Sequence, residues 1–166
     1  MNYKIFKSIN RLSGHYSPID LLMIFISNKL RYVFLFVLIF MWFRNDFSKR
    51  ISFLAVISAG VALFLNTLIK LFYFTPRPFV KRRVGILIPS KTDSSFPSKH
   101  TILAFAVSTS ILLYKRTLGL IMWTLSMLTG FSRIWIGHHY PFDILGSAFI
   151  GTMTSILVNK IFRRVI

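Results

Sequence analysis

The chain has 166 residues, of which 54% are hydrophobic, and its 21 Lys and Arg stand against four acidic residues, all of them Asp. Long apolar blocks exclude an ordinary soluble domain of this length and indicate an integral membrane protein. The sequence contains no Cys, which excludes disulfides and thiolate metal sites. So few carboxylates disfavour a Mg²⁺ or Ca²⁺ site. The basic residues punctuate apolar segments, so we expect a lipid bilayer as partner and no nucleic acid.

The first 28 residues predict an interfacial segment. Within 1–16, apolar residues recur at helical spacing with basic and polar residues between them, which is typical of an amphipathic helix on a membrane surface. No apolar core with a cleavage site follows, so we do not expect a signal peptide. We interpret 18–28 as a shallow approach to a first spanning helix at 30–43, and one long tilted helix is the alternative.

Four further apolar segments predict spanning helices bounded by polar or basic loops. They cover 51–74, 99–114, 118–135 and 142–162. The expected fold class is therefore all-α: a polytopic membrane helical bundle of about five spanning helices within 30–162, plus the amphipathic N-terminal helix. We expect a single domain over 1–166, because no linker or second soluble segment is visible.

Counting the crossings predicts which polar residues share a membrane face. The loop after the first of these four spans and the loop after the third must lie on the same side. The polar residues expected to converge there are Lys70, Arg77, Ser98, Lys99, His100, Arg133, His138, His139 and Asp143.

The opposite face collects basic residues in short segments, and the positive-inside rule makes that face cytoplasmic. These residues are Arg44, Lys49, Arg50, Lys115, Arg116, Lys160, Arg163 and Arg164. The converging residues are then expected on the extracellular or periplasmic side. The basic amino terminus conflicts with the rule, because five crossings place it outside as well. The loop on the converging side is expected to attract an anionic substrate or headgroup through Lys81, Arg82, Arg83 and Lys91.

The converging residue types suit phosphate chemistry. Arginine binds phosphate oxygens in bidentate fashion, and lysine adds a point charge. His139 and Asp143 are four positions apart and would lie on one side of a helical start. A carboxylate bonded to one ring nitrogen would fix the tautomer and leave the other nitrogen as a nucleophile. His100 would protonate the leaving oxygen and then activate water, so we expect a phosphohistidine intermediate on His139.

Each of these residues also has a simpler interpretation when it is taken alone. Arg133 and Lys70 could be snorkelling interfacial cations. Ser98 could simply be a helix N-cap, and His100 could simply hydrogen-bond within a loop. Their convergence on one face favours a phosphate site. His138 lacks a carboxylate four residues on and is not expected to be the nucleophile. The aromatic residues nearby are expected to form an interfacial belt: Trp123, Trp135 and Tyr140.

Three short motifs carry a resemblance to a known family. They are Lys70-x6-Arg77-Pro78, Pro97-Ser98-Lys99-His100 and Ser132-Arg133-x5-His139-x3-Asp143. Their order, spacing and helix context resemble the signature of the type 2 phosphatidic acid phosphatase superfamily. The resemblance implies an all-helical bundle that releases phosphate without a metal or other cofactor. It also implies His139 as nucleophile, Asp143 as its orienter, His100 as acid and base, and phosphate binding by Lys70, Arg77, Ser98 and Arg133. Lys99 stands where the family usually has Gly.

Nearly the whole chain is also similar to bacterial undecaprenyl-diphosphate phosphatases of the bacitracin-resistance type. This resemblance implies a polyprenyl diphosphate substrate, converted to undecaprenyl phosphate at the outer face of the cytoplasmic membrane, where the carrier lipid of cell-wall synthesis is recycled. The alternatives are a phosphatase for phosphatidate or phosphatidylglycerol phosphate, and a non-catalytic membrane component of transport or resistance. A haloperoxidase of the same superfamily is disfavoured by the apolar spans.

Overall fold

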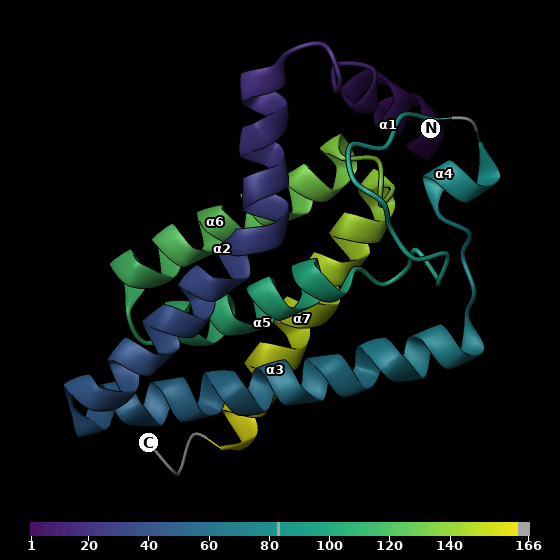
Figure 1. The fold of residues 1–166 in the computed structure, drawn as a ribbon. Helices are drawn as coiled ribbons and strands as arrows, with labels where there is room; N and C mark the ends of the chain where they lie inside the picture. The colour runs from purple at the N-terminus through teal and green to yellow at the C-terminus, as the bar shows by residue number, and fades with distance from the viewer. Residues whose placement is uncertain (83, 163–166) are drawn as a thin grey trace.

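The computed structural model describes residues 1–82 and 84–162, and these residues form seven helices and no strand (Figure 1). The expected all-α fold is therefore confirmed. Three of the basic residues considered above, Arg83, Arg163 and Arg164, lie outside the described residues.

Helix α1, Asn2–Asn10, packs on the ends of two later helices. Its Phe6 is fully buried, with its ring 5.4 Å from the ring of Tyr140. The side-chain amide of Asn10 donates a hydrogen bond of 3.0 Å to the carbonyl of Trp135. The expected N-terminal helix is thus present, and an aromatic contact and an amide hydrogen bond fasten it to the bundle.

Helix α2, Ser17–Arg44, is one continuous helix that changes direction part-way along (Figure 1). Residues 18–28 and 30–43 therefore belong to one continuous helix, as in the alternative of a single long helix, and no break separates the two parts. The polar break in the apolar run does not end the helix, because Ser27 is buried and accepts a hydrogen bond of 2.7 Å from Arg133. The polar side chain faces a partner helix and leaves the backbone helical.

Four further long helices complete the bundle. They are α3 (Asp46–Phe72), α5 (Lys99–Leu112), α6 (Arg116–Trp135) and α7 (Pro141–Ile161), with the single-turn α4 (Pro78–Lys81) between α3 and α5 in the chain. Helix α5 is the central one, since it contacts α3, α6 and α7 and most of its residues are buried. Small polar residues let these helices approach closely; the hydroxyl of Ser110, for example, bonds those of Ser58 and Ser155 at 3.1 and 2.8 Å.

Three of the described helices are long and apolar enough to cross a membrane: α2, α3 and α7. Helix α5 is apolar but has only 14 residues. At ~1.5 Å per residue it spans ~21 Å, which is shorter than a ~30 Å hydrocarbon core. The sequence predicted about five spanning helices. Three of the described helices meet the criteria of length and apolar character, and α5 and α6 pack with them in the bundle. The chain is a membrane protein.

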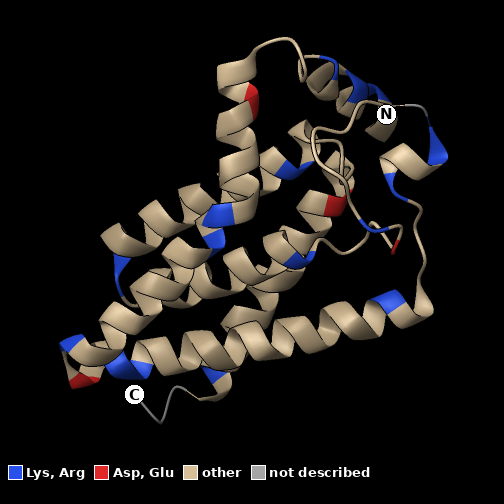
Figure 2. Cartoon of the chain, viewed as in Figure 1, with Lys and Arg blue, Asp and Glu red and all other residues tan. Residues whose placement is uncertain are grey.

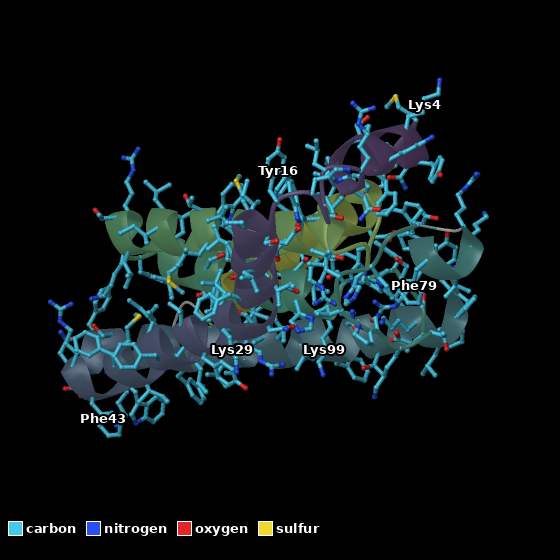
Figure 3. The ribbon with its side chains drawn as sticks, turned by 45° about the horizontal axis from the view of Figure 1, so that its top comes forward. Lys4, Tyr16, Lys29, Phe43, Phe79 and Lys99 are labelled. Atoms are coloured by element: carbon cyan, nitrogen blue, oxygen red, sulfur yellow. The ribbon has the colours of Figure 1, made fainter. Side chains whose placement is uncertain are left out.

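The helix directions bring the predicted polar clusters together. Helices α3 and α6 end, and α5 and α7 begin, at the same end of the bundle, which we call the site end. Figure 2 shows Lys and Arg at both ends of the bundle and at the bend of α2, with few acidic residues in the part of the chain that is drawn in colour. In Figure 3, Lys4 of α1 and Phe79 of α4 lie toward the site end, and Phe43 of α2 lies at the opposite end.

Candidate active site

All seven predicted site residues lie at the site end. Five of them are buried, namely Arg77, Ser98, Arg133, His139 and Asp143. Lys70 and His100 are half-buried. They come from the ends of α3 and α6, from the starts of α5 and α7, and from the segments that join these helices. The crossing count therefore brings together residues that are about 70 positions apart in the sequence.

His139 is held by one ring nitrogen. Its Nδ1 lies 2.7 Å from the carbonyl oxygen of Ser95, so Nδ1 donates and Nε2 carries the lone pair. Burial lowers the pKa of His139 well below its ordinary value, and the charges of Arg133 and Arg77 lower it further. Among the described residues, Nε2 has no hydrogen-bond partner. The result is a neutral, oriented imidazole with one nitrogen left to react.

Asp143 does not bond the imidazole directly among the contacts of the described residues, which corrects the expected pairing. Its Oδ2 accepts hydrogen bonds from the hydroxyl of Ser95 and from the amide of Tyr140, the latter at 2.9 Å. The reason is its place in the first turn of α7, where a carboxylate satisfies a free backbone N–H. Asp143 therefore reaches His139 through Ser95, whose carbonyl fixes the ring.

Lys70 and Arg77 form a cationic clamp that is closed on an internal carboxylate. Lys70 Nζ lies 3.0 Å from Oδ2 of Asp93, and Arg77 Nη2 and Nε lie 2.7 and 3.1 Å from Oδ1. Arg77 Nη1 also donates to the hydroxyl of Ser90 at 3.1 Å. Nε and Nη2 of Arg77, which both contact Oδ1 here, are a pair of donors with which a guanidinium can bind a phosphate in bidentate fashion. Asp93 thus stands where a phosphate group would be expected.

Arg133 is buried at the end of α6 and is only partly satisfied. Its Nη1 donates to the hydroxyl of Ser27 at 2.7 Å. Its Nε is buried and has no partner among the described residues. Because a buried unpaired donor is unfavourable, this nitrogen is a candidate to bind an anion. A snorkelling arginine would instead extend to the membrane surface, so the simpler interpretation of Arg133 does not fit its burial.

Ser98 occupies the N-cap position of α5, but its side chain makes no cap hydrogen bond. Its amide donates to the hydroxyl of Ser147 at 2.7 Å, and its own hydroxyl accepts from Thr101 at 3.1 Å. The hydroxyl proton of Ser98 is thus left for another acceptor. His100, two residues on, lines a cavity together with Lys99.

His138 has a structural role that separates it from its neighbour. Its Nε2 donates to the carbonyl of Ile88 at 2.9 Å, and its ring lies 6.2 Å from that of Phe79. Burial is the main cause that lowers the pKa of His138 to about 4. It therefore holds the segment between α4 and α5. That His138 is not the nucleophile remains a prediction.

The expected aromatic belt is wrong for two of its three residues. Trp135 and Tyr140 are buried, and the indole N–H of Trp135 donates to Asp20 at 2.8 Å. Trp123 is half-buried and packs edge-on against Phe105. Trp135 and Tyr140 help to build the site end from within, and Trp123 packs against α5 farther along the bundle.

Sequence reasoning missed four residues that contact the predicted site: Ser27, Ser90, Asp93 and Ser95. Two signals were present. Ser27 interrupts an apolar run, and Asp93 is one of only four acidic residues. The roles of Ser27 and Asp93 become clear only when their partners in the fold are known. Among the described residues, no group of three His, Cys, Asp or Glu is gathered as for a metal ion.

A model of the PAP2 superfamily matches residues 51–166. The chain belongs to this superfamily. The resemblance drawn from the three motifs is therefore confirmed, and the helical bundle around the clamp and His139 is the superfamily's fold in this protein.

Full-length comparisons agree with this assignment. The chain is 44% identical over 158 residues to the undecaprenyl-diphosphatase BcrC of Bacillus subtilis, a match that covers 95% of this chain and 82% of that protein. It is 31% identical to the bacitracin transport permease protein BcrC of Bacillus licheniformis, covering 95% and 79%. The crystal structure of LpxE from Aquifex aeolicus superposes with a TM-score of 0.82 at 27% identity, covering 96% of this chain and 94% of that one.

Proposed function

We propose that this PAP2 protein hydrolyses a polyprenyl diphosphate, namely undecaprenyl diphosphate, to the lipid monophosphate and inorganic phosphate. The observation that carries the proposal is the state of His139, which is neutral and held at Nδ1 in a site that also holds Arg77 and Arg133. Its Nε2 has no hydrogen-bond partner in the described part of the chain. The name of the Bacillus subtilis relative supports this choice of substrate. The release of the monophosphate would recycle the carrier lipid of cell-wall synthesis and would confer bacitracin resistance.

The proposed reaction has two steps and uses no metal. Nε2 of His139 attacks the terminal phosphorus, and the bond from that phosphorus to the bridging oxygen breaks. His100 protonates the leaving oxygen of the lipid monophosphate. His100 then takes a proton from water, which attacks the phosphohistidine and releases inorganic phosphate. Asp143 and Ser95 keep the imidazole oriented throughout.

Charge on the transferred group is stabilised by the surrounding donors. Lys70, Arg77 and Arg133 would bind its equatorial oxygens, and the Ser98 hydroxyl would donate one further hydrogen bond. The unpaired Nε of Arg133 supports this role. Asp93 must leave the clamp or give up some of its donors, because a phosphate and a carboxylate cannot occupy the same donors at once.

The same proposal places the protein in the bacterial cytoplasmic membrane with the site end outside, as a single domain over 1–166. Basic residues in short loops at the opposite end support this orientation. The chain has no Cys, so a Cys introduced at Ser8 can be labelled selectively in whole cells. Labelling by a membrane-impermeant maleimide is expected. Labelling only after lysis would contradict the orientation.

Phosphate release from undecaprenyl diphosphate tests the activity. Purified protein in excess EDTA is expected to release phosphate, and His139→Ala is expected to lose activity by at least about 10³-fold. His138→Gln serves as the neighbouring control. Phosphatidate and phosphatidylglycerol phosphate, compared at equal concentration, test the alternative substrates. An undiminished His139→Ala variant would refute the proposed nucleophile.

The name of the Bacillus licheniformis relative favours one further candidate, a non-catalytic part of a bacitracin transport system. The two candidate functions predict different levels of bacitracin resistance in whole cells that express a catalytically inactive variant. If the protein acts by catalysis, the His139→Ala variant should confer no bacitracin resistance at equal expression. Resistance that persists in this variant would favour the transport role.

A further inference from the structure

A groove of 330 Å³ lies between α2 and α5 beside the candidate site. Helix α2 contributes Ser27, Arg31, Phe34 and Leu38, which lie on one helix face because they are spaced by three or four residues. The polar residues, Ser27 and Arg31, lie at the end of the groove nearer the site, where Ser27 bonds Arg133. The apolar residues follow toward the opposite end of the bundle.

Helix α5 supplies the other wall with the same polarity. Lys99 and His100 begin the helix, and Leu103 and Val107 continue the same face. Both walls therefore change from polar to apolar in the same direction, away from the site end. A groove with this division matches an amphiphile whose headgroup is anionic.

Two cations of the groove lack an acidic partner. Among the described residues, the two ion pairs both belong to Asp93, and neither includes Arg31 or Lys99. Among the described residues, the hydrogen bond and ring contact of Arg31 are both with its neighbour Tyr32, at 3.1 Å and across the ring face. Arg31 also lies near the middle of α2, a helix long enough to span the membrane. Charged residues at such positions usually bind an ion or a substrate.

His100 links this groove to the reaction. As the proposed acid it must touch the leaving oxygen, so the leaving group has to lie on the side that His100 faces. His100 lines the groove. The part of the substrate that stays on the lipid therefore enters between α2 and α5.

We infer that Lys99 and Arg31 form a second phosphate subsite, which binds the phosphate retained on the lipid, while the apolar part of the groove holds the first isoprene units. This inference rests on the proposed function and extends it, because it assigns the preference for a diphosphate over a monophosphate to two residues. It also gives a role to Lys99, the residue that departs from the glycine usual in the family.

Product inhibition tests the subsite. Farnesyl phosphate carries the retained phosphate, whereas inorganic phosphate represents the transferred one. Lys99→Gly and Arg31→Gln are each expected to raise the inhibition constant of farnesyl phosphate about 10-fold, the effect of losing one charge-assisted hydrogen bond. The inhibition constant of inorganic phosphate should change less than about 2-fold in the same variants. Lys29→Gln removes a cation that does not line the groove and is the matched control.

Either of two other outcomes would refute the proposed subsite. If neither inhibition constant changes, the two cations only contact lipid headgroups. If both constants rise together, Lys99 and Arg31 belong to the clamp for the transferred phosphate. Direct binding of radiolabelled farnesyl phosphate does not depend on turnover, so it separates failure of the subsite from failure of the proposed function.

A second variant tests the apolar wall. Leu103→Trp places a larger side chain in the groove and is expected to raise the KM for undecaprenyl diphosphate without changing inhibition by inorganic phosphate. Leu120→Trp, at an exposed position of α6 that does not line the groove, is the control. An unchanged KM in Leu103→Trp would mean that the isoprene chain leaves the site by another route.

Discussion

The carboxylate of Asp93 contacts two cations: its Oδ1 lies 2.7 Å from Nη2 of Arg77, and its Oδ2 lies 3.0 Å from Nζ of Lys70. Partial burial acts to raise the pKa of Asp93, but the hydrogen bond from Lys70 and the charge of Arg77 together lower it. Asp93 is therefore ionised at neutral pH. Its side chain remains 47% exposed, so it can leave the clamp without opening a core. An incoming phosphate competes with this internal anion.

Removing the charge of Asp93 should strengthen phosphate binding. In Asp93→Asn, we expect inorganic phosphate to inhibit several-fold more strongly, because the amide holds the two cations less tightly than a carboxylate does. The inhibition constant at pH 7 measures the effect. Asp46→Asn, at the opposite end of the bundle, is the charge-matched control. A weaker inhibition in Asp93→Asn would mean that the carboxylate shapes the clamp rather than competes for it.

Ser95 should act on the rate and not on substrate binding. Ser95→Ala removes the hydroxyl that bonds Asp143 but keeps the carbonyl that orients His139. We expect kcat to fall about 10-fold with KM unchanged, since the imidazole loses only part of its support.

A double-mutant cycle identifies Ser95 as a positioning residue. If Asp143 acts through Ser95, the double variant Ser95→Ala with Asp143→Asn should be little slower than Asp143→Asn alone. A purely structural role would give additive losses. Additive effects on kcat would therefore contradict the link between these two residues.

His138 should make the fold sensitive to acid. Its pKa is about 4 in the folded protein, compared with ~6.5 when unfolded. Between these values the unfolded state binds more protons, so the contribution of His138 is complete above pH ~6.5 and is lost as the pH falls toward ~4. Protonation would place a hydrogen on Nδ1, which is buried without a partner among the described residues.

Thermal unfolding in detergent at pH 7.5 and pH 5 measures this effect. His138→Gln keeps a donor for Ile88 but does not titrate, so it should lose less stability on acidification than the native chain, by on the order of 2 kcal/mol. His15→Gln, at an exposed position, should behave like the native chain. Equal losses in His138→Gln and the native chain would remove His138 as the cause.

Ser27 should stabilise the buried end of α6. Ser27→Ala leaves Nη1 of Arg133 without its acceptor, which should cost about 1–3 kcal/mol of unfolding free energy. Ser27→Thr keeps the hydroxyl and is the matched control. Unfolding in a denaturing detergent measures both variants. Stability equal to that of the native chain in Ser27→Ala would show that solvent or lipid satisfies the guanidinium instead.

Sequence patterns predicted the bundle and the meeting of Lys70, Arg77, His100 and His139, because crossing parity needs only apolar length and order. They failed where one polar side chain could serve either a helix end or a distant partner. From the sequence, Ser27 indicated a break between two segments, whereas in the structure it is a hydrogen-bond partner of Arg133 on a neighbouring helix. Asp143 had the spacing to bond His139, but the backbone amide of Tyr140 at the start of α7 and the hydroxyl of Ser95 bond the same carboxylate oxygen.

The contact between Asp93 and its two cations also lay outside sequence reasoning. It joins an irregular segment to the end of α3, and no helical or strand period relates such positions. Trp135 was misjudged for a similar reason. Its indole N–H suits a membrane surface as well as a buried acceptor, and only the fold supplies Asp20 as that acceptor.

The fastening of α1 has a practical consequence for handling the protein. Phe6 and Asn10 bind α1 to the site end, and Met1 itself is 86% exposed there. A purification tag or fluorescent protein fused at Met1 would emerge beside the candidate active site. A fusion placed beyond Ile161, the last residue of α7, would emerge at the far end of the bundle. Fusions of the second kind leave the proposed lipid groove between α2 and α5 unobstructed.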